Sequence, residues 1–394
     1  MSKKPTDTHI NSSNKKKLPI LSLLVLAASC FIVILTETLP AGLLLPISDS
    51  LNISEAMAGQ LVTSYALGSL VAAMPLSIAT RTWDRRTVLI ISISAFAVIN
   101  FLTSITSNYL LMLLLRFLVG MSAGLLWSII AGYAARIVKP EFQGRAIAIS
   151  MVGTPLALSL GLPASTFLGE LVGWRIVFSM MSVLGVLLIV LILSRMPKLP
   201  GQDTKTKLTL YRVFALPGMI GILLTLFLFI ISHNILYTYI GPITTLSGLS
   251  NKLSSILLVF GICSLISIAL IGILVDKHLR VMMLSSLFLF ILASFCLTLW
   301  TSHSLIIYFA VAVWGLGYGG SATLFQTATA RTAGADIDVA QSMTVVAWNL
   351  SIGGGGVIGG LCLVIGPEAL PAFTLPLLFI ALVTVLLNSK HGFR

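Results

Sequence analysis

The sequence has few charged residues and more apolar residues than a soluble protein can bury. Charged residues make up 9% of its 394 positions, whereas hydrophobic residues make up 57%. Apolar runs of about 18 residues or more, long enough to cross a bilayer, recur along the chain. We therefore expect an integral membrane protein, with the lipid bilayer as a partner.

Patterns that mark enzymes, metal centres and ATP-driven pumps are also missing. The chain has no HExxH motif, no paired carboxylates in its apolar runs and no glycine loop followed by Lys-Ser or Lys-Thr. Its four cysteines lie in apolar segments without a CxxC pair or a Cys/His cluster, so neither a metal nor a disulfide is expected. No catalytic residue, metal or cofactor is predicted, and no loop is long enough for the output domain of a sensor.

Hydropathy predicts an all-α membrane protein with twelve spans in two groups of six. The spans are expected near 19–47, 56–80, 86–107, 109–136, 143–170, 174–195, 214–243, 251–275, 281–300, 303–330, 337–365 and 369–388. The predicted domains are a tail at 1–18, a six-helix bundle at 19–195, a polar linker at 196–213, a second six-helix bundle at 214–388 and a tail at 389–394.

Most of the positive charge lies on one side of the predicted spans. The formal net charge is +12, and 21 of the 24 Lys and Arg residues fall in the two tails and in alternate loops. Arg175 and Lys252 lie in loops on the other side, and Arg116 lies inside a span. Because cytoplasmic loops carry such an excess, both termini are expected in the cytoplasm. The charge thus indicates topology and not a nucleic-acid partner.

One carboxylate lies inside the first apolar run, next to two prolines. Glu37 is followed by Pro40 and Pro46, which remove backbone donors and favour a bend beside a wet cavity. An ionised carboxylate is costly in hydrocarbon, so it is expected to face a cavity, to pair with a cation or to take up a proton. The alternative is a side chain that reaches the outer surface, although about 18 Å of helix separates Glu37 from Asp49.

The loop after the eighth predicted span carries a resemblance to a known family. The pattern Gly272-x-Leu274-x-Asp276-Lys277, with Arg280 after it, resembles the cytoplasmic loop signature Gly-x-Leu-x-Asp-Arg of the major facilitator superfamily. This resemblance implies a loop that takes part in conformational change.

The corresponding loop of the first half departs from that signature. Arg81 stands where the family has its aspartate, and Asp84 stands where it has its second glycine. The basic residues Arg85 and Arg86 are kept, so the loop motif is expected here without the family's acidic group.

Motifs inside the spans resemble the twelve-span drug:proton antiporters of the same superfamily. Arg116-x-x-x-Gly120 resembles the signature of the proton-driven members, and Glu37–Leu44 and Gly173–Phe178 resemble bacterial sugar-efflux, purine-nucleoside-efflux and chloramphenicol-resistance exporters. The antiporter helix motif would comprise Gly153, Pro155, Gly161 and Pro163. The resemblance covers essentially the whole chain. It implies the major facilitator fold, two pseudo-repeat halves with a substrate site between them, alternating access and function as a monomer.

Arg116 is the only basic residue inside a predicted span, and its depth of roughly 10 Å is similar to that of Glu37. A nearby guanidinium favours a charged carboxylate, whereas desolvation favours the protonated form, so a conformational change could switch between the two. We expect Glu37 to load a proton from outside and to release it inside, with Arg116 tuning its affinity. The alternative is a structural arginine that donates hydrogen bonds to helix carbonyls.

The remaining polar groups inside the spans suggest an uncharged cavity. His233 could share the proton or contact cargo, and it could equally join two helices. Asn234 and Tyr237 follow it in the same helix. Trp127, Gln326 and Asn349 are further candidates for the substrate cavity, with helix packing as the alternative for each. Such a cavity favours uncharged or weakly cationic cargo.

Together these features predict a secondary active transporter that exports small organic molecules, such as drugs, sugars or nucleosides, by proton antiport. Import by proton symport stays open, because the direction rests on the resemblance alone. A membrane-embedded enzyme or a sensor is the alternative from another class, and the missing motifs disfavour it.

Overall fold

The computed structural model describes residues 18–80, 82–139, 142–201, 214–333, 337–388 and 392–393. Within these ranges the chain is helical, without a strand, and twelve helical segments are long and apolar enough to cross a membrane. This result confirms the predicted all-α membrane fold.

Ten helical elements lie in the described residues of the first half. They are α1 (Ile20–Gly42), α2 (Leu44–Leu51), α3 (Glu55–Ala79), α4 (Arg85–Ile105), α5 (Tyr109–Arg136), α6 (Gln143–Met151), α7 (Gly153–Leu156), the π-helix η3 (Ala157–Gly161), α8 (Leu162–Val172) and α9 (Trp174–Arg195). The four elements from α6 to α8 run end to end and form one span, 146–172.

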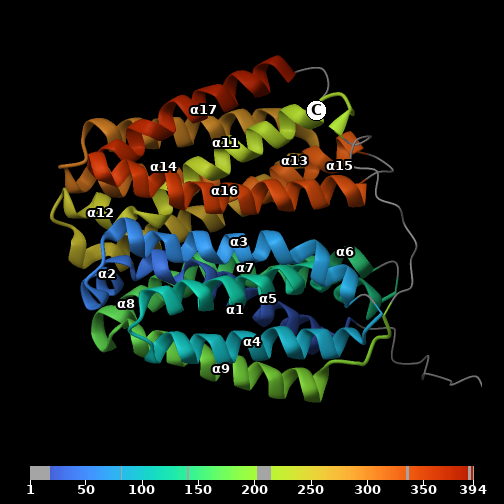
Figure 1. Cartoon of the computed structure of the whole chain (residues 1–394). Coiled ribbons are helices and arrows are strands. Elements are labelled where there is room, and N and C mark those ends of the chain that lie inside the picture. The colour runs from blue at the N-terminus through green and yellow to red at the C-terminus, as the bar shows by residue number, and fades with distance from the viewer. Residues whose placement is uncertain are drawn as a thin grey trace, which may run out of the picture.

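Among the residues of the second half that the structure describes, eight helical elements are present. They are α11 (Met219–Thr238), α12 (Ile240–Thr245), the 3-10 helix η4 (Ser250–Lys252), α13 (Leu253–Leu299), α14 (Ser304–Tyr318), α15 (Ser321–Ala333), α16 (Ile337–Ile365) and α17 (Ala369–Leu387). Figure 1 shows the helices of each half packed together, with α3 of the first half facing α16 of the second. We call the end where α1 begins and α17 ends the termini side, and the opposite end the far side.

The first and tenth predicted spans are interrupted, each for a local reason. The first breaks between Gly42 and Leu44 because Pro46 cannot donate to the carbonyl four residues earlier. The tenth breaks at Gly319–Gly320, where the Gly320 N–H donates to Ser267 Oγ at 3.2 Å. The eighth and ninth spans both lie in α13, which consists of two helices that meet at His278, where the backbone leaves helical geometry.

The two halves repeat the same helix crossing. In the first half, a Cβ on Gly120 would overlap the main chain of Tyr65, because α5 crosses α3 there at close range. In the second half, Gly315 stands in the same relation to the main chain of Phe260. Gly315 lies 195 positions after Gly120, and Phe260 lies 195 positions after Tyr65, so the two halves share one backbone framework.

In each half, an arginine caps the C-terminal end of the last helix. Arg86 donates to the carbonyl of Leu193 near the end of α9. Arg280 donates to the carbonyls of Val385 and Leu386 at the end of α17, at 3.0 and 3.2 Å. The last carbonyls of a helix lack partners inside that helix, and a cation near them also suits the helix dipole. These loop arginines therefore stabilise helix ends on the termini side.

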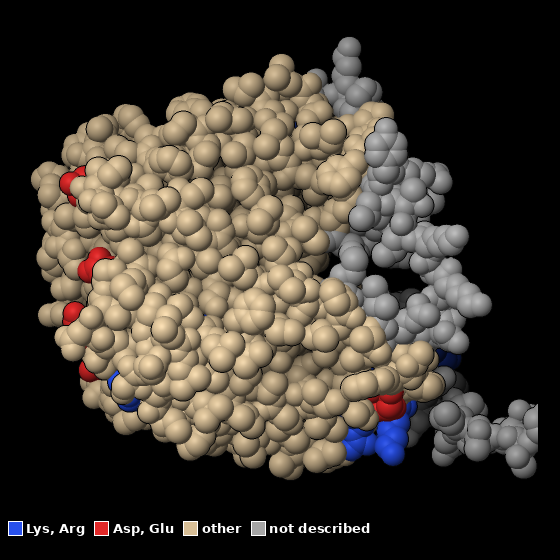
Figure 2. Space-filling model, in the orientation of Figure 1, with Lys and Arg blue, Asp and Glu red and all other residues tan. Residues whose placement is uncertain are grey.

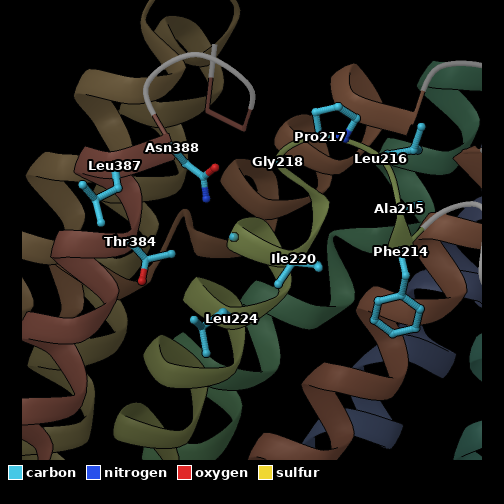
Figure 3. A pocket seen from close by; sticks show the side chains of 11 residues that line it. Phe214, Ala215, Leu216, Pro217, Gly218, Ile220, Leu224, Thr384, Leu387 and Asn388 are labelled. Carbon is cyan, nitrogen blue, oxygen red and sulfur yellow. The ribbon is translucent and has the colours of Figure 1, made fainter.

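Charge is separated between the two sides of the bundle. On the face seen in Figure 2, the acidic side chains lie mostly along the far side, and most basic side chains lie at the termini side. A groove of about 520 Å³ lies on the termini side of the second half, between the start of α11 and the end of α17 (Figure 3). Phe214, Leu224, Thr384 and Asn388 are among its lining residues, and none of the predicted site residues lines it.

The close crossing of α3 and α5 predicts that Gly120→Ala destabilises the protein. The added methyl group would meet the carbonyl of Tyr65, and such overpacking costs about 1–3 kcal/mol. Gly132→Ala, in the same helix, is the control because nothing lies within 4 Å of its Cβ position. Alanine has the higher helix propensity, so this variant should be more stable than the wild type by up to about 1 kcal/mol. Thermal unfolding in detergent measures both variants. Equal melting temperatures would contradict the role of Gly120.

Candidate functional site

Arg116 of α5 links three helices of the first half by hydrogen bonds. Its side chain is 1% exposed. Nη1 donates to the Thr36 carbonyl at 2.7 Å and Nη2 to the Glu37 carbonyl at 3.0 Å, both in α1. Nε donates to the Leu61 carbonyl of α3 at 3.2 Å. The guanidinium thus bonds main-chain oxygens rather than the Glu37 carboxylate, which is the structural alternative considered for this arginine.

A proline in α1 explains why an arginine is needed there. Pro40 lies inside α1 and has no N–H, so the carbonyl of Thr36, four residues earlier, loses its helical donor. Arg116 supplies that donor. A buried carbonyl without a donor is unfavourable, and an arginine in a low-dielectric interior needs acceptors. Each group therefore satisfies the other.

Two further polar side chains surround the same turn of α1. Asn100 of α4 is 1% exposed and donates to Thr36 Oγ1 at 3.1 Å. Tyr65 of α3 donates to the Val33 carbonyl at 3.2 Å, and its ring lies 4.9 Å from the Arg116 guanidinium. Four helices of the first half therefore converge on one polar turn.

Glu37 lies on this turn and is half-buried. The Arg116 guanidinium donates to the main-chain carbonyl of Glu37, and no ion pair joins it to the Glu37 carboxylate among the described residues. Glu37 lies on α1, which also packs against α11 of the second half.

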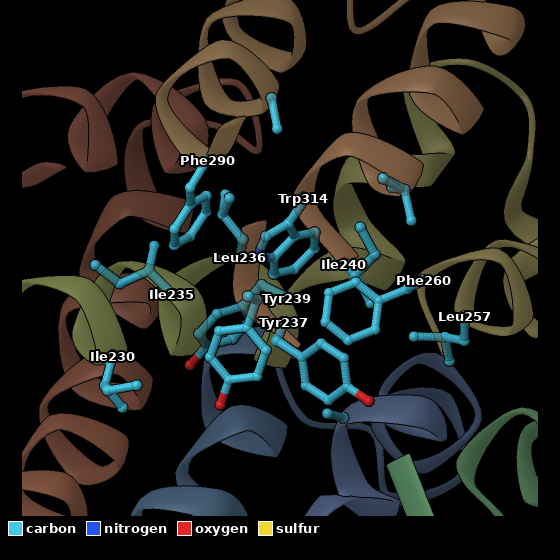
Figure 4. Close-up of a cluster of buried hydrophobic side chains, with 14 of the residues drawn as sticks. Ile230, Ile235, Leu236, Tyr237, Tyr239, Ile240, Leu257, Phe260, Phe290 and Trp314 are labelled. Carbon is cyan, nitrogen blue, oxygen red and sulfur yellow. The ribbon is translucent and has the colours of Figure 1, made fainter. Parts of the chain in front are cut away.

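The second half presents aromatic rings at the same region. The rings of His233 in α11 and Tyr318 in α14 stack with centroids 3.5 Å apart and planes 8° apart. Tyr237, one helical turn after His233, lies 4.9 Å from its ring. Trp314, one turn before Tyr318, lies 5.3 Å from the His233 ring. Figure 4 shows Tyr237, Phe260 and Trp314 gathered from three helices of this half.

The other predicted cavity residues make different contacts. Asn234 donates to the Ile230 carbonyl of its own helix at 2.8 Å, and Asn349 donates to the Val345 carbonyl at 3.0 Å. Trp127 packs against the apolar cluster of the first half, and Gln326 is exposed. The structure therefore places Arg116 beside Glu37 in the first half and Tyr237 beside His233 in the second half. Asn234, Asn349, Trp127 and Gln326 make other contacts.

The predicted antiporter helix motif coincides with the π-helix. Gly153 packs against the main chain of Ala27 in α1, and Gly161 packs against the Phe31 ring. Pro155 and Pro163 remove donors on either side of the π turn, which shifts the hydrogen-bond register between them. In the middle of this turn, the main chain of Ser159 touches Gly261 of the second half.

The predicted loop motifs fall partly outside the described residues. Arg81 and the side chain of Asp276 lie outside them. Asp84 caps α4, because its side chain accepts a hydrogen bond from the Thr87 N–H at 3.0 Å. The Arg85 N–H donates to the Leu199 carbonyl at 2.8 Å.

In the second-half loop, no neighbour lies within 4 Å of a Cβ placed on Gly272, and Lys277 is exposed.

Hydrogen bonds join the two halves on the far side. Tyr239, next to the end of α11, donates to the Gly356 carbonyl of α16 at 2.7 Å and approaches the Ala56 carbonyl of α3 at 3.4 Å. Gln60 of α3 donates to the same Gly356 carbonyl at 3.1 Å. Thr63 donates to the Gly353 carbonyl at 3.3 Å. We call these residues the far-side latch.

Sequence reasoning missed several members of the site, although simple signals marked them. The position of Pro40 implies a free carbonyl at Thr36. Two aromatic pairs at i,i+4 spacing, His233 with Tyr237 and Trp314 with Tyr318, indicate ring faces on two helices. Asn100 carried no such local signal, because its partner Thr36 is distant in sequence.

Twelve spans in two repeated halves, with polar groups at their meeting point, define a membrane transporter. The sequence profile of the Major Facilitator Superfamily matches residues 26–355, and the chain belongs to that superfamily. It is therefore a multi-pass inner-membrane transporter of small molecules and not an enzyme.

Named relatives and solved structures agree with this assignment. The chain is 30% identical over 337 residues to the purine ribonucleoside efflux pump NepI of Shigella sonnei, covering 85% of each protein. It is 29% identical over the same length to NepI of Escherichia coli K12. Its fold matches the crystal structure of the nucleoside transporter NupG with a TM-score of 0.76 at 15% identity, covering 95% of this chain and all of that one. A bacterial homologue of the human lysosomal transporter Spinster matches with a TM-score of 0.70 at 16% identity, covering 95% of this chain and 98% of that one.

The pairing of Arg116 with the carbonyl freed by Pro40 predicts a non-additive pair of substitutions. Arg116→Gln should lower the free energy of unfolding by about 1–3 kcal/mol for each carbonyl left without a donor. Pro40→Ala restores an N–H for Thr36, so Arg116→Gln should cost at least about 1 kcal/mol less in that background. A double-mutant cycle in mixed micelles measures the coupling.

Arg175→Gln serves as the control in the same cycle. Arg175 bonds Ser50 Oγ, the Thr106 carbonyl and Ser107 Oγ, so its effect should add to that of Pro40→Ala. Additivity of Arg116→Gln with Pro40→Ala would show that the arginine does not replace the missing donor.

Proposed function

We propose that this transporter exports purine ribonucleosides or closely similar neutral molecules in exchange for protons. The observation that carries the proton coupling is the position of Glu37. Among the described spans, it is the only acidic residue more than three positions from a span end. It is half-buried at the meeting point of the two halves, and it is not tied up in an ion pair with Arg116. Such a carboxylate can gain and lose a proton as its surroundings change.

The nature of the cargo is inferred from relatives and from the site. The NepI relatives are named as purine ribonucleoside efflux pumps. The second-half face of the site consists of uncharged rings, which suits a neutral molecule with a flat part. Purine ribonucleosides fit both points.

Movement between two states follows from the placement of the latch. The hydrogen bonds between the halves described above lie on the far side, so we infer that the described state is closed there. With both termini in the cytoplasm, this state faces inward, and Glu37 would release its proton to that side. The two six-helix halves are the moving units in this proposal, within a single monomer.

Glu37→Gln should abolish transport that is driven by a proton gradient, because the amide cannot carry the proton. In everted membrane vesicles, accumulation of labelled inosine under an imposed proton gradient should fall to background. Exchange of labelled for unlabelled inosine without a gradient should persist, since that exchange needs no net proton movement. Glu170→Gln is the matched control, because Glu170 is exposed on the far side.

Three results would contradict the proposal. Gradient-driven accumulation by Glu37→Gln would exclude this residue as the coupling group. Inosine uptake in the direction of proton flow would favour symport and import. A wild-type protein that moves no nucleoside would exclude the proposed cargo.

Tyr239→Phe should loosen the far-side latch. Losing the hydroxyl removes the bond to the Gly356 carbonyl, worth about 0.5–1.5 kcal/mol, which shifts a two-state equilibrium roughly threefold to tenfold towards opening. Pulsed electron paramagnetic resonance between labels at Ser50 and Ser250, one exposed position in each half, reports the change.

Tyr308→Phe is the control for the latch, because the Tyr308 hydroxyl bonds Ser255 within the second half. It should leave the distance distribution unchanged. An identical distribution for Tyr239→Phe and the wild type would refute the latch.

A further inference from the structure

Three polar atoms in the ring cluster of the second half have no hydrogen-bond partner. They are His233 Nδ1, Tyr237 Oη and Trp314 Nε1. Their side chains are 4%, 4% and 1% exposed. Seven buried side-chain polar atoms lack a partner in the described part of the chain, and these three are gathered around one group of rings. The ring centroids of Tyr237 and Trp314 are 6.0 Å apart.

Packing alone does not account for this choice of side chains. Buried polar groups are normally hydrogen-bonded, because an unpaired one loses its bond to water and gains nothing in return. Phenylalanine would fill an apolar ring cluster without that loss, and Phe260 and Phe290 do so beside Trp314. Three unpaired atoms at one place therefore indicate groups kept for a ligand.

The chemistry of the three atoms limits what they can bind. The Trp314 N–H can only donate, the Tyr237 hydroxyl can donate or accept, and His233 Nδ1 can do either depending on its tautomer. The side chains whose rings contact them are uncharged. Flat faces with donors at their edges match a neutral, planar ring that carries acceptor nitrogens or a carbonyl oxygen.

We propose that His233, Tyr237 and Trp314 form a recognition site for a neutral, nitrogen-bearing heteroaromatic ring, which is the flat part of the cargo. The inference rests on the proposed function for its link to transport. It assigns ring recognition to the second half, apart from the proton-coupling group in the first.

Tyr318 is placed to open this site. Its ring covers the His233 ring at 3.5 Å, in the position that a stacked ligand ring would take. It is the last residue of α14, directly before the break at Gly319–Gly320. A change of angle at this break moves Tyr318 off His233 and exposes the three polar atoms.

The test uses purified full-length protein in lipid nanodiscs and changes each polar atom while keeping a ring. The variants are His233→Phe, Tyr237→Phe and Trp314→Phe. Calorimetric titration with inosine, hypoxanthine and ribose separates the ring from the sugar. Wild-type protein should bind inosine and hypoxanthine but not ribose, and each variant should bind both ring compounds roughly tenfold more weakly. Two variants outside the site are the controls: Trp300→Phe in the loop before α14, and Tyr308→Phe at the far side. Both should bind the ring compounds as the wild type does.

Thermal unfolding of the same variants separates binding from structure. Tyr237→Phe removes an unpaired buried hydroxyl, so its melting temperature should be unchanged or higher while its affinity falls. A lower melting temperature with unchanged affinity would show that the hydroxyl serves folding. A higher melting temperature with unchanged affinity would show that these atoms hold only water. Either result overturns the site, as does a wild-type protein that binds neither ring compound.

Failure of the proposed function gives a different pattern. Ring binding that depends on the three residues, without proton-driven export of inosine from vesicles, would refute the cargo or the coupling and leave the site standing. Proton-driven export with ring binding unaffected in all three variants would refute the site alone.

Discussion

A cation in a low-dielectric interior must be held by fixed acceptors, and Arg116 meets that requirement with main-chain carbonyls. Because one of them is the carbonyl that Pro40 deprives of its donor, the bend in α1 and the buried arginine stabilise each other. This arrangement has a consequence for Glu37. A carboxylate in a direct buried ion pair would be held in its charged form, whereas one beside an already satisfied arginine can exchange its proton.

The repeated framework carries different chemistry in its two halves. The close crossing at Gly120 and Tyr65 recurs at Gly315 and Phe260, so the backbone geometry is shared. In the first half, that crossing supports a buried arginine and a carboxylate, and in the second it supports stacked rings. In the proposed mechanism the two repeats divide these roles: the first half carries the group that responds to protons, and the second carries a neutral surface for cargo.

The sequence was sufficient for the number of spans because long apolar runs depend only on local composition. It also predicted that Glu37 and Arg116 lie near each other. It did not predict that the guanidinium bonds carbonyls, although the spacing of Pro40 and Thr36 allowed that inference. The far-side latch was beyond sequence reasoning, since Tyr239 meets Gly356 only after α3, α11 and α16 have packed.

The glycine contacts distinguish rigid from movable parts of the molecule. Within each half, glycines such as Gly120 and Gly315 pack against main chain, which cannot rotate away. Between the halves, Gly59 packs against the Tyr239 side chain and Gly356 against the Thr63 side chain, both of which can change rotamer. Among the described glycines, Gly261 alone packs tightly on main chain across the interface, at Ser159 in the π-helix. The contact of Gly261 with Ser159 therefore sets the π-helix of the first half directly against the second half, at a point where neither backbone can rotate away.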